Sequence, residues 1–153
     1  MTNLNVREEL FCKVKAQIET IPDIRFFDWQ KGQFERPKSK NPIPLPACLM
    51  EISAIAYADL MQQLQEGRAV VSLYLYVGGC ADNFDESAEL ARGLTDLKII
   101  DTVAEAVQWL AGTQFKPLSQ KLEQSLSQTH KMLAYRLDFE TRIYKQLERR
   151  FVF

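Results

Sequence analysis

The stretch RAVVSLYLYV, residues 68–77, decides the fold class of this chain. Ala69, Val71, Leu73, Leu75 and Val77 alternate there with Val70, Ser72, Tyr74 and Tyr76. Successive side chains of a β-strand point to opposite faces, so one face of this strand is wholly aliphatic and the other is amphipathic. We therefore predict a strand whose aliphatic face lines the core.

Two further long strands are expected around it. Residues 47–53 place Cys48, Met50 and Ile52 on one face and Leu49 and Glu51 on the other. Residues 133–143 also alternate, and their polar face carries Arg136, Asp138, Glu140 and Arg142. This alternation predicts a half-buried strand with one face in water.

Shorter segments extend this pattern. Residues 24–29 are rich in β-branched and aromatic side chains, which favours a short strand. Residues 54–67 leave two readings open, because Leu60, Met61 and Leu64 allow a helical turn while Ile55 and Tyr57 allow a longer strand. Gly78 and Gly79 are expected to end the strand at residue 77.

Two helices are expected, over residues 6–20 and 95–111. Asn5 followed by Glu8 is an N-cap pattern, and apolar residues then recur every four positions up to Ile18. In the second helix, Ile99, Val103, Val107 and Leu110 share one stripe with a helical period. Gly112 stands where a left-handed C-cap is expected, and the start is open because residues 87–92 can already be helical.

The order of these elements is helix, three strands, helix and strand, without a regular βαβ repeat. It predicts an α+β fold, in which an antiparallel or mixed sheet carries the N-terminal helix and the second helix on one face. The 153 residues are of a common size for one domain, so we expect a single domain over residues 1–153.

The amino-acid composition limits which partners and which location the protein can have. Lys and Arg number 19 against 20 Asp and Glu, so no bulk charge attracts nucleic acid or an anionic membrane. The longest uncharged apolar run, residues 69–81, is shorter than the roughly 20 residues that span a bilayer. We also see no basic-then-apolar leader, and expect a cytoplasmic protein.

Cys12, Cys48 and Cys80 are widely spaced, which indicates reduced thiols and no metal site.

The sequence offers little for catalysis. His130 is the single histidine, and no GxSxG elbow surrounds any serine, so we predict no catalytic residues and no cofactor. Asp138 and Glu140 share a strand face, and with Glu51 they form the alternative of a metal-dependent phosphoesterase. Ion pairing with neighbouring arginines on a solvated sheet explains the same residues without a metal.

What remains is surface suited to partners. Residues 30–46 combine one glycine and four prolines with basic residues, which predicts a long surface loop that is either a connector or a contact. Residues 149–153 follow two arginines with three apolar residues, and we expect them to dock on their own domain or on a neighbour. The candidate interaction residues are Lys31, Arg36, Lys38, Lys40, Arg136, Asp138, Glu140 and Arg142.

The whole order resembles the tail-completion, or tail-terminator, proteins of bacteriophages and prophages. The resemblance is carried by FFDW at 26–29, the step PIPLPA at 42–47 into a strand, FKPL at 115–118 and YRLDFET at 135–141. It implies a non-enzymatic assembly protein at the tail end or head–tail junction, associated with the virion and often a ring of identical subunits. It also implies tail-tube or head–tail connector proteins as partners, and no catalytic residues. A stand-alone adaptor or immunity-type binding module is the alternative.

Overall fold

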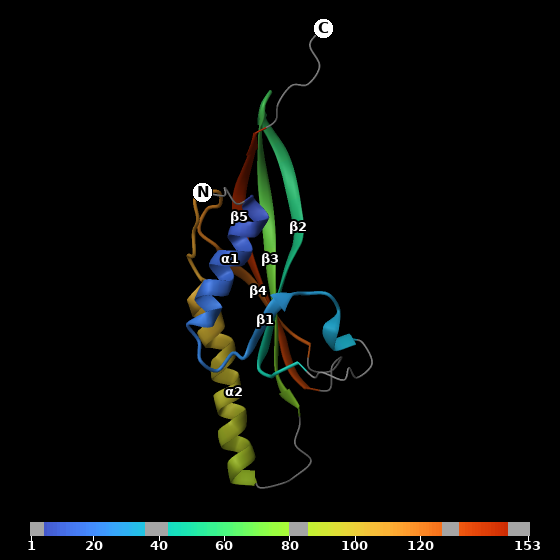
Figure 1. Cartoon of the computed structure of the whole chain (residues 1–153), viewed down its shortest axis with the longest axis vertical. Coiled ribbons are helices and arrows are strands. Elements are labelled where there is room, and N and C mark those ends of the chain that lie inside the picture. The colour runs from blue at the N-terminus through green and yellow to red at the C-terminus, as the bar shows by residue number, and fades with distance from the viewer. Residues whose placement is uncertain (1–4, 36–42, 80–85, 127–131, 147–153) are drawn as a thin grey trace.

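The computed structural model describes residues 5–35, 43–79, 86–126 and 132–146. Within these ranges the chain forms two α-helices, one short 3-10 helix and five strands (Figure 1). In chain order they are α1 (Val6–Glu19), β1 (Phe26–Trp29), η1 (Gln33–Glu35), β2 (Ala47–Met61), β3 (Leu64–Gly79), α2 (Glu86–Val107), β4 (Ser119–Ser125) and β5 (Met132–Gln146). The strands form one mixed sheet in the order β1-β2-β3-β5-β4. The predicted α+β class is confirmed.

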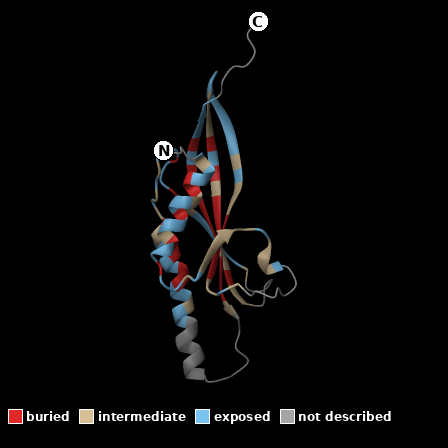
Figure 2. Cartoon of the chain, in the orientation of Figure 1, coloured by how far each residue is buried: buried red, intermediate tan, exposed pale blue. Residues whose placement is uncertain are grey.

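Both helices pack on the aliphatic face of the sheet. Val71, Leu73 and Leu75 of β3 are fully buried in one cluster with α1, α2 and β5 (Figure 2). Val103 and Val107 of α2 belong to the same cluster, as the matching stripes predicted. Leu110, the last residue of the predicted stripe, is only partly buried against it.

The N-terminus of α1 is capped as the sequence indicated. The Asn5 side chain accepts a hydrogen bond from the backbone N–H of Glu8 at 2.9 Å. It satisfies one of the N–H groups that the first turn of a helix leaves without a partner.

Strands β2, β3 and β5 form a long ribbon that projects beyond the helices (Figure 1). Residues 54–67, for which helix and strand were both open, are strand apart from a turn after Met61. Gly67 belongs to β3, where a Cβ would lie 2.9 Å from Ile55 and from Ile143 and 3.1 Å from Tyr57. A glycine there lets these side chains close over the backbone. Strand β3 also continues through Gly79, so the two glycines do not end it at residue 77.

Strand β4 was not expected from the sequence. Residues 119–125 read as a polar segment, and the side chains from residue 121 to residue 125 are exposed. The strand is held by its backbone pairing with residues 135–140 of β5 at the border of the sheet. An edge strand outside the core needs no apolar alternation, so its sequence carries no period-two signal.

The end of α2 differs from the prediction. The helix ends at Val107, and the residue with positive φ is Trp109 (φ 67°), not Gly112. Backbone bonds Trp109 N to Leu118 O (2.7 Å) and Leu118 N to Leu110 O (2.9 Å) divert the chain into the segment before β4. These two tertiary hydrogen bonds replace a last turn of helix.

Gly112 is required for another reason, which is the close approach of α1. The carboxylate of Glu9 accepts hydrogen bonds from Thr113 Oγ1 (2.6 Å), Gln114 N (2.9 Å) and Gln114 Nε2 (3.3 Å). A Cβ on Gly112 would lie 2.1 Å from Glu9 Oε1 and 2.4 Å from the ring of Phe115. Burial raises the pKa of Glu9, but the hydrogen bonds from Thr113 and Gln114 outweigh it and hold the pKa below its usual value.

We predict that Leu73→Ala lowers the free energy of unfolding by about 2–5 kcal/mol, because it removes a fully buried side chain and leaves a cavity. Denaturant midpoints measure the change. Leu122→Ala on the exposed face of β4 is the control and should change stability by less than about 0.5 kcal/mol. Equal midpoints for both variants would contradict the core assignment.

We predict that Gly112→Ala costs about 1–3 kcal/mol, because the added methyl group meets the Glu9 carboxylate and the Phe115 ring. Gly78→Ala is the matched control, since nothing lies within 4 Å of a Cβ at that position. Thermal unfolding of the two variants measures the difference. If the Gly112→Ala protein were as stable as the Gly78→Ala protein, the Glu9 carboxylate could move away from the added methyl group without loss of unfolding free energy.

Candidate interaction surface

The face of the sheet opposite the helices is the candidate surface, and we call it the open face. The register of β3 and β5 places three pairs of residues side by side on it, namely Val70 with Glu140, Ser72 with Asp138, and Tyr74 with Arg136. Arg142 lies opposite Arg68 one step further toward the projecting end. The four charged residues predicted on β5 therefore do share one face.

Asp138 is the most buried of the four. It is 8% exposed, and it accepts hydrogen bonds from Ser72 Oγ (2.6 Å) and Arg136 Nε (2.9 Å). Ser53 of β2 in turn contacts the Ser72 hydroxyl through its own hydroxyl group. Asp138 therefore orients Arg136 and is not itself available to a partner. The sequence alone did not distinguish Asp138 from the other three charged residues. The pairing of Ser72 with Asp138 depends on the register of β3 and β5.

Arg136 and Tyr74 form the neighbouring part of the open face. The Arg136 guanidinium lies 5.7 Å from the centre of the Tyr74 ring. Burial and the nearby Glu51 carboxylate raise the pKa of Tyr74 to about 12. The hydrogen bond to Asp138 raises the pKa of Arg136 above its ordinary value. At neutral pH this part of the face presents a fixed cation and a protonated phenol.

Two cross-strand ion pairs cover the face toward the projecting end. Arg68 Nε lies 3.5 Å from Glu140 Oε1, and Arg142 Nη1 lies 2.5 Å from Glu66 Oε1. Both arginine side chains are about half exposed, at 57% and 46%. Solvent screens such pairs, so each contributes little to stability. Their guanidinium groups remain within reach of a partner.

The opposite end of the open face is covered by the segment after β1. Phe34 of η1 stacks on Tyr76 at 4.0 Å between ring centres, over a small cluster that includes Leu49 and Ala134. Lys31 is exposed and pairs with Asp28 at 3.2 Å. Three other predicted contact residues, Arg36, Lys38 and Lys40, lie outside the described residues.

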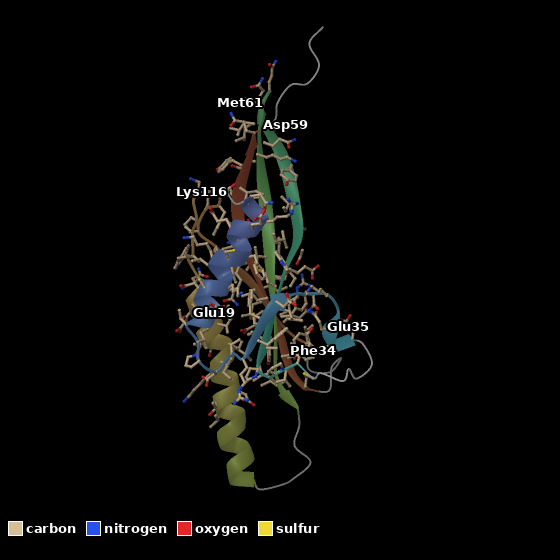
Figure 3. The ribbon with its side chains drawn as sticks, in the orientation of Figure 1. Glu19, Phe34, Glu35, Asp59, Met61 and Lys116 are labelled. Atoms are coloured by element: carbon tan, nitrogen blue, oxygen red, sulfur yellow. The ribbon has the colours of Figure 1, made fainter. Side chains whose placement is uncertain are left out.

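The projecting end of the ribbon carries exposed apolar side chains. Tyr57, Leu60 and Met61 are 41%, 50% and 66% exposed. Figure 3 shows Asp59 and Met61 together at this end, beyond the helices. Large apolar groups gathered on one protruding element are typical of contact surfaces. The sequence left this segment between two readings and did not identify it as a surface.

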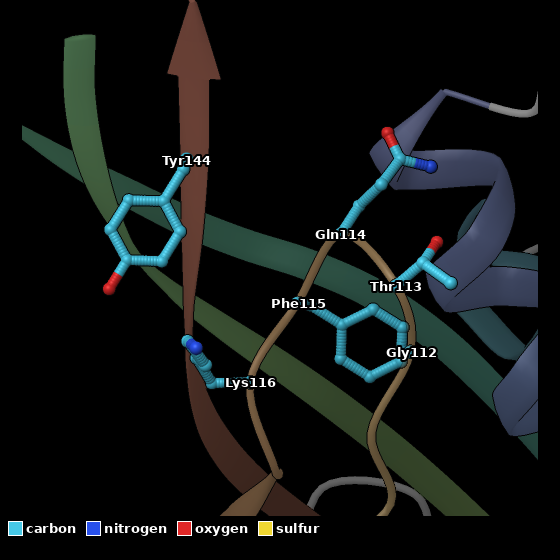
Figure 4. A pocket seen from close by; sticks show the side chains of 6 residues that line it. All are labelled: Gly112, Thr113, Gln114, Phe115, Lys116 and Tyr144. Carbon is cyan, nitrogen blue, oxygen red and sulfur yellow. The ribbon is translucent and has the colours of Figure 1, made fainter.

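A shallow hollow of about 290 Å³ lies between β5 and residues 112–116 (Figure 4). Lys116 lies over the Tyr144 ring, 5.9 Å from its centre. Glu9 binds the neighbouring Thr113 and Gln114, so its carboxylate is already occupied. Lys116 is therefore the one charged residue among those that line the hollow, and no second charged group stands ready to bind a small molecule beside it.

Among the described residues, those weighed for metal or thiol chemistry do not form a metal-binding cluster. In the described part of the chain, no three His, Cys, Asp or Glu side chains lie close enough to hold a metal ion. Cys12 is exposed, and Cys48 is buried, which raises the pKa of its thiol. Cys80 and His130 lie outside the described residues. Across the described helices, none is long and apolar enough to cross a membrane.

No protein-family model matches the sequence, and no curated protein matches it. A solved chain from the virion of a native gene transfer agent (GTA) particle is similar over 87% of this chain and 84% of its own length. It shares 14% identity with a TM-score of 0.35.

We predict that Asp138→Asn costs about 1.5–3 kcal/mol, because Arg136 and Ser72 both lose a buried anion. Glu140→Gln is the control on the same strand face, where the exposed pair with Arg68 is worth less than about 1 kcal/mol. Urea unfolding of both proteins measures the difference. Similar costs for the two substitutions would mean that the Asp138 cluster is as weak as an ordinary surface pair.

Proposed function

We propose that this chain is a non-enzymatic structural assembly protein of a phage or prophage, which acts at the tail end or head–tail junction. Its copies pack head to tail into a closed ring. The observation that carries the proposal is the order of elements. An N-terminal helix, a short strand, a proline-rich step and long strands follow one another as in the tail-completion proteins that the sequence resembles.

The chemistry of the open face supports a binding role over a catalytic one. Two of the three carboxylates considered for metal-dependent catalysis already have partners, since Asp138 accepts bonds from Ser72 and Arg136 and Glu140 pairs with Arg68. A metal ion would have to displace these arginines. The phosphoesterase alternative therefore loses two of its three ligands, while the arginines suit a protein partner.

The ring contact is assigned to the open face and the loop between β1 and β2. Arg142 and Arg136 supply cations on the face, and the loop adds positive charge through Lys31 and, in its sequence, Arg36, Lys38 and Lys40. The net charge of −1 leaves little repulsion between copies. Head-to-tail contacts close into a ring when the rotation between copies permits, and otherwise give an open filament.

We predict that Arg142→Glu weakens self-association severalfold, because it reverses an exposed charge on the proposed contact. Lys15→Glu on α1 is the control, since it reverses an equally exposed charge on the helical side of the molecule. Light scattering across protein concentration gives the mass, and electron microscopy with purified tail tubes shows whether the rings bind there. Added salt should weaken the assembly in parallel, because exposed charges are screened over about 10 Å at 0.1 M.

Two outcomes would contradict the proposal. A strict monomer at high concentration that also ignores tail tubes would favour the adaptor or immunity-type module. Equal losses for Arg142→Glu and Lys15→Glu would move the contact away from the open face.

A further inference from the structure

The outer edge of β2 is an open strand edge. Strand β1 pairs only with residues 47–50 of β2, so residues 51–61 have β3 on one side and no strand on the other within the described chain. Backbone N–H and C=O groups along such an edge are a template for another strand.

Between the register irregularities at residues 53 and 60, this edge lacks the side chains that usually protect against added strands. Proteins commonly block an edge with lysine or proline, and residues 47–61 contain no lysine, arginine or proline. Their only charges are those of Glu51 and Asp59. From Ala56 to Met61 every residue is exposed. The edge is therefore both accessible and weakly acidic.

The side chains along the edge alternate in size. Ala54, Ala56 and Ala58 lie on the open face, opposite Val70, Arg68 and Glu66 of β3. Ile55, Tyr57 and Asp59 lie on the other face, opposite Ala69, Gly67 and Gln65. An added strand would thus meet small side chains on one face, and two apolar side chains followed by an acid on the other.

We propose that residues 149–153 of a second copy of this chain add to this edge as an antiparallel strand. The segment reads Arg-Arg-Phe-Val-Phe, and its three apolar residues favour extended structure. Antiparallel pairing sets Arg149 opposite Asp59, Phe151 opposite Tyr57 and Phe153 opposite Ile55, all on one face. Arg150 and Val152 then lie opposite the small Ala58 and Ala56.

The pairing direction follows from the residues. Antiparallel pairing joins opposite charges and stacks aromatic side chains, both of which stabilise cross-strand pairs. Parallel pairing over the same residues would place Arg149 beside Ile55 and Phe153 beside Asp59. It would lose the charge pair and set an aromatic ring beside an acid, while Phe151 would face Tyr57 in either direction.

The donor must be another copy because of distance. Gln146 of β5 pairs with Leu64 of β3, so an added strand beyond β2 lies three strand spacings away, about 14 Å. The three residues from Gln146 to Arg149 reach at most about 11 Å. The same chain therefore cannot place Arg149 opposite Asp59, whereas a neighbouring copy can.

The inference rests on the self-association in the proposed function, but not on a role at phage tails. Each copy offers one segment and one edge, so the contact is head to tail. Strand addition supplies backbone hydrogen bonds, and the open face and loop remain free to contribute further contacts.

Cysteine cross-linking tests the register directly. Full-length chains with Asp59→Cys are mixed with full-length chains with Arg149→Cys, both in a Cys12→Ser, Cys80→Ser background. Opposed residues of antiparallel strands lie about 4.5–5.5 Å apart at Cα, within the range that a disulfide spans. We expect a 59–149 disulfide between different copies, identified by peptide mass spectrometry. Leu122→Cys replaces Asp59→Cys as the control on the opposite border of the sheet, and should give at most background cross-linking.

Charge exchange gives an independent readout. Asp59→Arg or Arg149→Asp alone should weaken self-association about fivefold, and the two together should restore it.

Cross-linking no higher than in the Leu122→Cys control, or no restoration in the double variant, would overturn the inference. A disulfide within single chains carrying both cysteines at high dilution would also overturn it. If the cross-link forms but the protein does not bind tail tubes, only the tail role is rejected. If rings bind the tubes but this cross-link does not form, only the strand addition is rejected.

Discussion

Burial of the aliphatic face of β3 is the constraint on which the rest of the molecule depends. β3 lies at the centre of the sheet, between β2 and β5, and Val71, Leu73 and Leu75 are fully buried under the two helices. Apolar surface removed from water stabilises the fold by about 25 cal/mol per Å². A slip of one residue would turn Ser72 and Tyr74 into this core. The register of every neighbouring strand is therefore tied to β3.

The same alternation creates the polar chemistry of the open face. Ser72 is inaccessible to solvent although neither α1 nor α2 covers its face, and it is satisfied by Asp138 on the adjacent strand. Among the described residues, every buried side-chain nitrogen or oxygen has a partner. A buried polar group without a partner would cost free energy, so Ser72, Asp138 and Arg136 specify the pairing of β3 with β5 as well as the surface.

The helical layer has a polar anchor of its own. Glu9 joins α1 to residues 113–114, and Gln17 Nε2 donates to Ala106 O at 2.7 Å. These contacts fix the helices over one face of the sheet. Partners are left with the open face, the free edge of β2 and the projecting end of the ribbon. The proposed assembly uses the open face, the free edge of β2 and the loop between β1 and β2.

The sequence by itself determined the α+β class, the strand around residues 68–77, the helix from Val6 and the charged face of β5. Each of these has a side-chain period or a cap that reports burial directly. It could not determine β4, the end of α2 at Val107 or the role of Gly112. Those features depend on backbone pairing at a sheet border, on hydrogen bonds to Leu118 and on the approach of Glu9 from α1. The open edge of β2 was hidden for the same reason. Whether a strand has a neighbour is decided by the arrangement of the whole sheet, and the residues of that strand carry no record of it.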